Sequence, residues 1–184
     1  KKARIDPYDV GVLRGYGVFD VSRTYNNQPF LLNEHFNRLK NSARILNLKI
    51  PVDLKKIQLI IKRLLAVNGF YKNKEAIIRI VLTGGVSKDG MTYNPHHPTL
   101  LVLTEELKSL SPAIYQNGVK LITYEYQREF PSAKTLNYMT ALRSRNLRQK
   151  NKAFEVLYTN KGKILEATTS NFFIFKNNYL ITPR

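Results

Sequence analysis

Two side chains in the last third of the chain, Lys134 and Glu166, could take part in the same chemistry. Lys134 lies in a short turn among Ser132, Ala133 and Thr135, between a predicted strand and a predicted helix. An amine fixed in a turn can form an imine with an aldehyde, and a carboxylate can hold the proton of a ring nitrogen. The pair therefore indicates catalysis with a compound that carries both an aldehyde and a pyridine ring.

The segment around Glu166 adds hydroxyl groups to this pair. Glu166 leaves a predicted hairpin and enters the run Thr168-Thr169-Ser170. The hydroxyls and backbone N–H groups of that run could bind polar atoms of the same compound. The elements that must position both residues are predicted to be a strand over 119–126, a helix over 138–150 and a strand over 153–159, followed by apolar strands over 172–175 and 179–181.

The first hundred residues contain helices and strands in alternation. A strand over 18–25 and a returning strand over 28–32 flank the turn signal Asn26-Asn27. Asn33 is predicted to cap a helix over 34–46, and Asp53 opens a second helix that ends at Asn68-Gly69. Strands over 76–83 and 99–104 enclose a long polar loop over 84–98.

These elements predict an α/β (α+β) chain of two domains. We expect a small N-terminal α/β domain over 1–108, an interdomain linker over 109–118 that carries turn signals, and the first part of a second, mixed-sheet domain over 119–184. The chain stops partway through what resembles a sheet, so we expect a C-terminal portion of the second domain to be missing.

Composition limits the class of protein. The chain has 184 residues, 43% of them hydrophobic, and no cysteine. These values are typical of a globular protein without disulfides, and no apolar run reaches the length of a membrane span. A cytoplasmic location is the expectation.

The formal charge of +17 allows a non-enzymatic alternative, a basic protein that binds nucleic acid. The densest basic cluster, 143–150, lies on one predicted helix, where a solvated helix face explains it more simply. An anionic cofactor and anionic substrates would also suit a positive field. We therefore expect no nucleic-acid partner.

No metal site is expected. His96 and His97 are adjacent, so their side chains point in different directions, and no cluster of carboxylates or thiolates accompanies them.

Four stretches, taken in order, resemble the class IV (fold type IV) pyridoxal phosphate enzymes, which include branched-chain aminotransferases, D-amino-acid aminotransferases and aminodeoxychorismate lyases. The stretches are RGYGVFD (14–20), EHFNRLKNSA (34–43), AKTLNYM (133–139) and GKILEATTSNFFIF (162–175). The resemblance implies a two-domain fold like that of D-amino-acid aminotransferase, pyridoxal 5′-phosphate as cofactor, and a homodimer.

The resemblance also implies roles for individual residues. Lys134 corresponds to the imine lysine and Glu166 to the partner of the pyridine nitrogen. Arg38, on residue pattern alone an exposed helix residue, corresponds to the arginine that grips the cofactor phosphate. Thr168 and Thr169 lie in the segment that lines the cofactor ring.

The residues expected to contact the substrate follow the family's pattern less closely. Phe19 lies where the family places an aromatic residue beside the substrate, and Tyr138 could reach the phenolic oxygen of the cofactor. The spacing from Lys134 to Asn137 is similar to that of the D-amino-acid enzymes, yet the loop 84–95 lacks their carboxylate-binding arginine and histidine. Lys88 is the nearest basic candidate for that task.

The reaction implied is transamination between an amino acid, of branched-chain or D type, and a 2-oxo acid. Two alternatives remain open: an aminodeoxychorismate lyase, which eliminates pyruvate and leaves aminobenzoate, and a paralogue that has kept the fold without catalysis.

Overall fold

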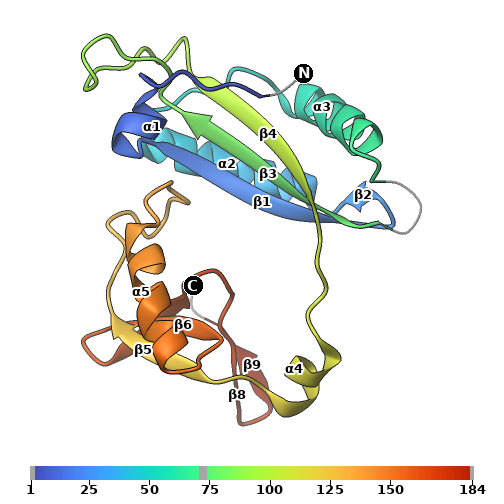
Figure 1. Ribbon diagram of the computed structural model, residues 1–184, viewed down its shortest axis with the longest axis vertical. Coiled ribbons are helices and arrows are strands. Elements are labelled where there is room, and N and C mark those ends of the chain that lie inside the picture. Colours follow the sequence, from blue (N-terminus) through green and yellow to red (C-terminus); the bar gives the residue numbers. More distant parts are fainter. Residues whose placement is uncertain (1–2, 71–73, 183–184) are drawn as a thin grey trace. The chain divides into compact units, whose positions relative to one another are not determined.

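The computed structural model describes residues 3–70 and 74–182, which form two compact units (Figure 1). The first unit contains Lys1–Lys108 and Ser132–Asn137, and the second contains Ser109–Pro131 and Tyr138–Arg184. The segment around Lys134 was expected in the second domain and instead belongs to the first unit. The reason is backbone hydrogen bonding to the first strand of that unit, described below.

The described residues of the first unit form a four-stranded antiparallel sheet of order β2-β1-β3-β4 and three helices. The strands are β1 (Gly17–Tyr25), β2 (Gln28–Pro29), β3 (Ala76–Thr83) and β4 (Thr99–Glu106). The helices are α1 (Val10–Arg14), α2 (Leu32–Ile45) and α3 (Leu54–Val67).

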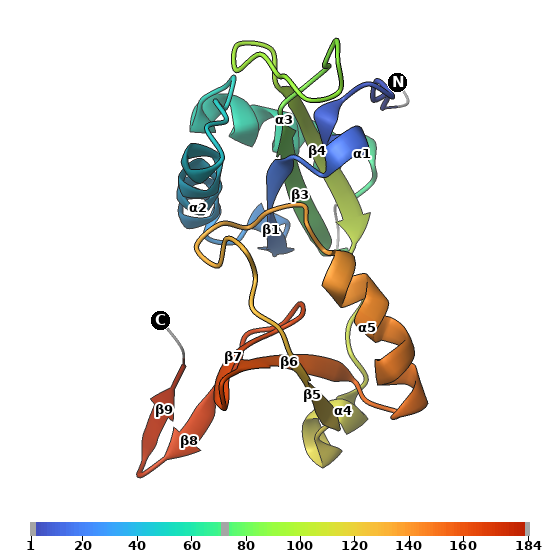
Figure 2. The ribbon, with the colours of Figure 1, turned by 90° about the vertical axis from the view of Figure 1, so that its left-hand side faces the viewer.

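Helices α2 and α3 pack against one face of this sheet (Figure 2). Alternate residues of β1 and β3 point toward the helices, as the two-residue period of a strand requires. The core residues are fully or almost fully buried and include Val18, Phe36, Leu39, Ile57, Ile61, Ile78, Ile80 and Leu82. Residues between them on β1, such as Phe19, therefore lie on the opposite face of the sheet.

Local sequence signals explain most element boundaries. The Asp53 carboxylate accepts a 2.8 Å hydrogen bond from the Lys56 N–H and caps α3, as predicted. Asn26 and Asn27 have φ values of 48° and 61°, the left-handed backbone that a tight hairpin between β1 and β2 needs.

Two local predictions were wrong. The returning strand predicted over 28–32 is reduced to β2, because the chain already enters α2 at Leu32. The predicted cap, Asn33, lies inside the helix. The cap position belongs to Leu31, which has a left-handed backbone (φ 47°) and makes no side-chain cap.

The second unit contains a three-stranded sheet of order β5-β6-β7 and a separate hairpin. Strands β5 (Leu121–Glu125) and β6 (Glu155–Asn160) are parallel and are connected through α5 (Met139–Lys150), whereas β7 (Lys163–Ala167) is antiparallel to β6. The hairpin is formed by β8 (Ile174–Lys176) and β9 (Tyr179–Ile181). The expected linker over 109–118 contains a short helix, α4 (Pro112–Asn117), whose first turn is capped by Ser111.

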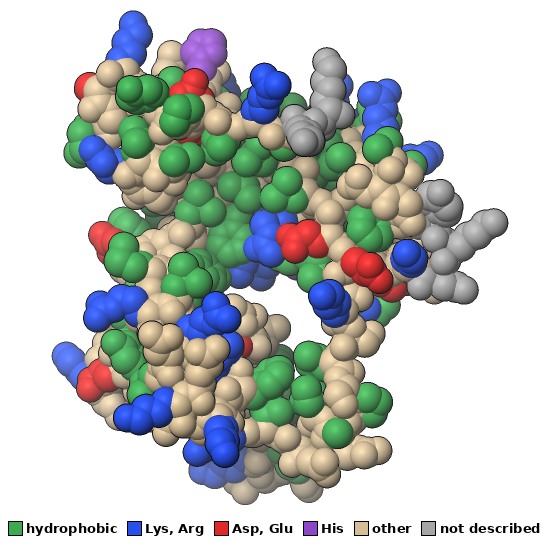
Figure 3. Space-filling view, viewed as in Figure 1, with side chains coloured by type: hydrophobic (Ala, Val, Ile, Leu, Met, Phe, Trp, Pro, Cys, Tyr) green, Lys and Arg blue, Asp and Glu red, His purple; other side chains and the backbone are tan. Residues whose placement is uncertain are grey.

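Basic side chains occur on the surface of both units (Figure 3). The densest basic cluster of the sequence lies on α5, where Arg143, Arg145 and Lys150 are exposed. None of the helices formed by the described residues has the length and apolar character of a membrane span.

The burial pattern of α3 predicts the effect of shortening its side chains. Ile61 is 0% exposed, and its replacement by alanine is expected to lower the free energy of unfolding by about 2–5 kcal/mol, because it leaves a cavity. Leu59 on the same helix is 42% exposed, so Leu59→Ala is the matched control and should change stability far less. Thermal and denaturant unfolding measure both variants. Equal losses for the two would contradict the packing of α3 described above.

Candidate active site

Backbone hydrogen bonds fix the Lys134 turn to the edge of β1. The Phe19 N–H donates to the Lys134 carbonyl (2.9 Å), and the Leu136 N–H donates to the Gly17 carbonyl (2.9 Å). The Lys134 N–H donates to the hydroxyl of the fully buried Ser42 on α2 (3.0 Å). This segment therefore pairs with the edge of β1 that β3 does not occupy, which explains why it belongs to the first unit.

Gly17, the second glycine of the GYG motif, makes this close approach possible. A Cβ at this position would lie 2.6 Å from a side-chain carbon of Leu136 and 2.6 Å from the Leu82 carbonyl oxygen. The Leu136 side chain could move aside, but the Leu82 carbonyl belongs to the backbone of β3 and could not, so the position needs glycine. Gly17 thus has a packing role where β1 lies between β3 and the lysine segment.

The Lys134 side chain lies beside an aromatic ring. Its Nζ is 5.0 Å from the ring centroid of Phe19, which is 7% exposed. An ammonium group in this position is attracted to the ring face by about 0.5–2 kcal/mol. The structure therefore brings together two of the predicted site residues, the amine and the aromatic residue on β1.

Arg38 on α2 is held by a buried carboxylate. Its Nε and one terminal nitrogen donate to the two carboxylate oxygens of Asp20 at 2.6 and 2.8 Å. Asp20 is 1% exposed, whereas the Arg38 side chain is 52% exposed. The His35 Nδ1 also lies 2.8 Å from Asp20. The guanidinium is thus anchored along one edge, and half of the side chain is accessible to solvent.

Asp20 was missed by the sequence analysis, although a signal was present. The alternation of β1 puts Asp20 on the face that α2 covers, and a buried charge requires a partner. The partners are one turn apart on α2, at His35 and Arg38, where i, i+3 residues share a face.

Lys88 stays apart from these groups. It is exposed in the loop between β3 and β4, next to Asp89. Backbone N–H groups of Thr92 and Met91 hold the pKa of the Asp89 carboxyl below its usual range, so this acid organises the loop. The described structure shows no contact of Lys88 with the other predicted site residues, and its substrate role stays a prediction.

In the second unit, Arg128 is the partner of Glu166. Glu166 lies on β7 opposite Tyr158 of β6, and its side chain is 43% exposed. The Arg128 Nε donates to the Glu166 carboxylate at 2.9 Å, and a terminal nitrogen of Arg128 donates to the Thr168 carbonyl at 3.1 Å. The Arg128 guanidinium carbon also lies 4.7 Å from the ring centroid of Tyr138. One arginine therefore links three predicted site residues, and the sequence analysis did not single it out.

A cavity of about 350 Å³ opens beside this ion pair. Its lining includes Arg128, Glu166 and Ser170, together with the apolar side chains of Ile164 and Phe172. A carboxylate, an arginine and a hydroxyl in one concave, partly apolar surface are typical of a site for a small polar ligand.

The hydroxyls of Thr168 and Thr169 are directed at a second buried acid. Glu155, 4% exposed, accepts hydrogen bonds from the hydroxyls of Thr168, Thr169 and Ser170. These side chains are thus engaged within the protein. Whether Thr168 and Thr169 line a cofactor ring stays a prediction. In that role their backbone or methyl groups, and not their hydroxyls, would contact the ring.

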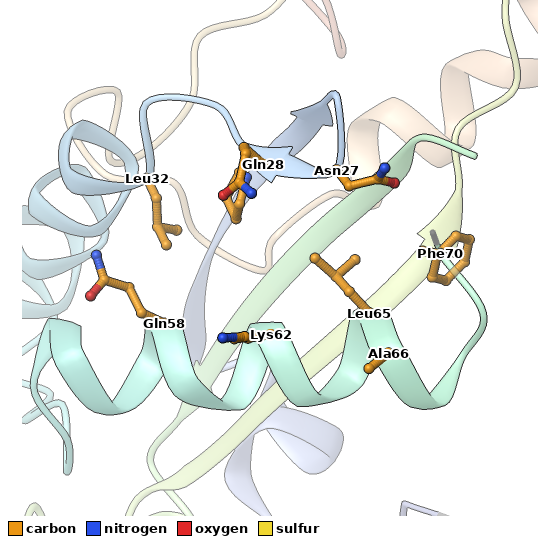
Figure 4. Close-up of a pocket in the computed structure, with 9 residues that line it drawn as sticks. Asn27, Gln28, Leu32, Gln58, Lys62, Leu65, Ala66 and Phe70 are labelled. Carbon is orange, nitrogen blue, oxygen red and sulfur yellow. The ribbon is translucent and has the colours of Figure 1, made fainter. Parts of the chain in front are cut away.

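Another cavity, of about 510 Å³, lies in the first unit between α3 and the β1–β2 hairpin (Figure 4). Leu32, Gln58, Lys62 and Phe70 are among its lining residues, and none of the predicted site residues lines it. Within residues 3–70 and 74–182, no cluster of three or more histidine and acidic side chains is arranged to hold a metal ion.

The predicted site residues thus form one group in each unit. Phe19, Arg38 and Lys134 lie on β1, α2 and the turn bound to β1. Tyr138, Glu166 and the 168–169 run are connected in the second unit through Arg128 and Glu155. The pairing of Lys134 with Glu166 at opposite ends of one ring stays a prediction.

The chain belongs to the class IV aminotransferase family, because residues 17–184 match the family described as Amino-transferase class IV. The predicted family is therefore confirmed.

Two relatives and one solved structure show the range of this similarity. The chain is 32% identical to a putative branched-chain-amino-acid aminotransferase of Methanocaldococcus jannaschii, over 100% of this chain and 64% of the relative. It is 29% identical to the aminodeoxychorismate lyase of Bacillus subtilis, over 100% of this chain and 63% of the relative. The chain therefore spans less than two thirds of the length of either relative.

The solved structure is a hypothetical aminotransferase from Mycobacterium tuberculosis in its α-ketoglutarate- and PMP-bound form. It superimposes with a TM-score of 0.85 at 23% identity, over 100% of this chain and 66% of the other. A likeness at this identity concerns the fold alone, and it confirms the predicted α/β architecture.

Tyr158 gives the second unit a measurable pH dependence. Burial raises the pKa of its phenol to about 12, against the opposing effect of the Arg128 charge, and its hydroxyl is buried without a hydrogen-bond partner among the described residues. The unfolded phenol ionises near 10.0, so above that pH the unfolded state binds fewer protons than the native state. The stability of the protein is therefore unaffected by Tyr158 ionisation below pH 10, and it falls as the pH rises from 10 toward 12.

We expect Tyr158→Phe to lose less stability over this alkaline interval than the wild type. At neutral pH its melting temperature should be unchanged or higher, because the substitution removes an unsatisfied hydroxyl. The control is Tyr179→Phe, since Tyr179 is 71% exposed. Thermal unfolding at several pH values measures the effect, and identical alkaline slopes for all three proteins would contradict it.

Proposed function

We propose that this protein is a pyridoxal 5′-phosphate-dependent aminotransferase that moves an amino group between an amino acid and a 2-oxo acid. Family membership and the name of the Methanocaldococcus relative support this assignment. The single observation that carries it is the Lys134 turn, in which three backbone hydrogen bonds fix a lysine beside an aromatic ring.

The residues fit the three functional groups of pyridoxal phosphate. An aldehyde needs an amine, which Lys134 provides. A phosphate suits the planar donors of a guanidinium, and Arg38 presents one that is half exposed and anchored to Asp20. A pyridine nitrogen suits a carboxylate, and Glu166 is 43% exposed at the edge of a cavity. The α-ketoglutarate- and PMP-bound neighbour supports the same cofactor class.

The chemistry divides between cofactor and protein. Bound pyridoxal phosphate supplies a conjugated ring that accepts the electrons left when the substrate α-carbon loses its proton. The protein supplies the base: the neutral Nζ of Lys134 accepts that proton, and the turn holds the nitrogen in place so that little conformational freedom is lost in the transition state.

Glu166 would accept a hydrogen bond from the protonated ring nitrogen. A carboxylate hydrogen-bonded to this N–H would keep the ring cationic. Arg128, which donates to the Glu166 carboxylate at 2.9 Å, would orient that acid. Arg38 would hold the phosphate, and Asp20 orients the Arg38 guanidinium for that contact.

The substrate side involves Phe19, Tyr138 and Lys88. Phe19 would limit space beside the amine, Tyr138 would bind the phenolic oxygen of the cofactor, and Lys88 would attract the substrate carboxylate. As in the family resemblance, we expect the protein to act as a homodimer.

A second candidate is aminodeoxychorismate lyase, favoured by the 29% identity to the Bacillus subtilis enzyme. The same lysine would remove the α-proton, after which pyruvate leaves. Incubation with amino donors and 2-oxo acids on one hand, and with aminodeoxychorismate on the other, distinguishes the two. Formation of pyruvate and aminobenzoate with the latter compound alone would identify the lyase.

Lys134→Ala is expected to abolish turnover and the visible absorbance of the protein–cofactor complex, because no other amine is held in this turn. After borohydride reduction, mass spectrometry should find the cofactor on the peptide that contains Lys134 in the wild type and on no peptide of the variant. Lys55→Ala, at an exposed position of α3, is the control and should behave as the wild type. A cofactor attached to another lysine would refute the assignment.

Arg38→Met should lower the affinity for pyridoxal 5′-phosphate by about 10-fold or more, since it removes charge-assisted hydrogen bonds. The affinity for pyridoxal, which lacks the phosphate, should change little. Arg44→Met is the matched control, because Arg44 is exposed on the same helix and bonds only to Asn41 in the described structure. Spectroscopic titration measures all three proteins. Equal weakening for both ligands would show that Arg38 supports the fold and does not contact phosphate.

A further inference from the structure

The most buried acid of the second unit is Glu155, the first residue of β6, which is 4% exposed. It has no role in the proposed mechanism. Burying a carboxylate away from water costs several kcal/mol unless hydrogen bonds replace the solvent. The identity of those replacing groups indicates what this acid does.

Three consecutive side chains provide the replacement. The Thr168 hydroxyl donates to Oε1, and the hydroxyls of Thr169 and Ser170 donate to Oε2 at 2.7 and 3.0 Å. The Val156 N–H also donates a hydrogen bond of 3.1 Å to Oε1. In an extended strand consecutive side chains point to opposite faces, so three that reach one acceptor require the chain to curl around it. We call these four residues, Glu155 and 168–170, the carboxylate clasp.

The carboxylate clasp connects directly to Glu166. The Thr168 N–H donates to the Val156 carbonyl at 3.0 Å, and the Thr168 carbonyl accepts from Arg128 at 3.1 Å. The same Arg128 donates to the Glu166 carboxylate at 2.9 Å. A chain of hydrogen bonds therefore runs from Glu155 through Thr168 and Arg128 to Glu166.

We propose that Glu155 is a positioning residue for Glu166: by holding the hydroxyls of 168–170, it fixes the Thr168 carbonyl, which fixes Arg128 and so the direction of the Glu166 carboxylate. This inference rests on the proposed function, because the task of Glu166 is to bind a pyridine N–H. Glu155 does not itself line the cavity; it contacts the lining through the Ser170 hydroxyl.

The experiment compares two ligands that differ in one ring atom. Pyridoxal 5′-phosphate has the ring nitrogen, and its 1-deaza analogue has a carbon there and offers Glu166 no N–H. Glu155→Gln keeps the size of the side chain and loses its charge. We expect this variant to bind pyridoxal phosphate on the order of 10-fold more weakly, as for a lost charge-assisted contact, and the deaza analogue within about 2-fold of wild type. A purely structural role would weaken both ligands equally, which would overturn the proposal.

A second variant covers the possibility that Glu155→Gln does not fold. Thr169→Val with Ser170→Ala removes the two donors to Oε2 at exposed positions, where stability should change little. This double variant should also bind pyridoxal phosphate more weakly while its affinity for the deaza analogue changes little, with a smaller difference than in Glu155→Gln. Unchanged affinity for both ligands in this folded variant would also overturn the proposal.

Glu166→Gln separates this inference from the proposed function. If Glu166 binds the ring nitrogen, Glu166→Gln must discriminate strongly between the two ligands, whatever Glu155 does. Absence of discrimination in Glu166→Gln refutes the role of Glu166 and with it the proposal. Discrimination in Glu166→Gln without any in the Glu155 and 169/170 variants refutes the proposal alone.

Discussion

The first unit's candidate site depends on one interaction, the pairing of the Lys134 segment with an edge of β1. A strand edge presents N–H and C=O groups that require partners, and the segment around Lys134 provides them at Gly17 and Phe19. Because of this pairing, Lys134 has a fixed backbone position although it lies in a loop. The segment approaches β1 at Gly17, where a Cβ would meet both the Leu136 side chain and the Leu82 carbonyl of β3.

Buried carboxylates organise both units of a chain that has few acids. The chain has 30 Lys and Arg residues but only 13 Asp and Glu, so a buried acid has many possible cationic partners. Asp20 binds Arg38, whereas Glu155 binds three hydroxyls. In each case the acid lies on a strand and orients a neighbouring segment. The cost of burying the charge is offset only if those partners stay in place, so a rigid site follows from the same contacts.

Membership of the class IV aminotransferase family defines the fold but leaves the reaction to details of the site. Relatives of similar identity are named as an aminotransferase and as a lyase, at 32% and 29%. The proposed removal of the α-proton is common to both reactions. What differs is where the proton and the electrons go next, and substrate-side residues such as Phe19 and Lys88 would decide that.

The sequence by itself determined the family, through four ordered motifs, and most local structure. The Asp53 cap of α3 and the hairpin at Asn26-Asn27 follow from interactions within a few residues, which a local pattern contains. Its errors came where longer-range structure prevails. Asn33 was displaced as a cap because α2 starts earlier, a helix formed in the expected linker, and the lysine segment joined the first unit.

Only the tertiary structure decided which charged groups meet. Arg128 and Glu166 are 38 positions apart, and Glu155 and Thr168 are 13 apart. The residue types show that each group needs a partner, but the choice among thirty cations and many hydroxyls depends on strand register and on how the turns fold. The sequence specified the reactive side chains, and the pairing of strands, which sums many weak contacts along the chain, specified what holds them.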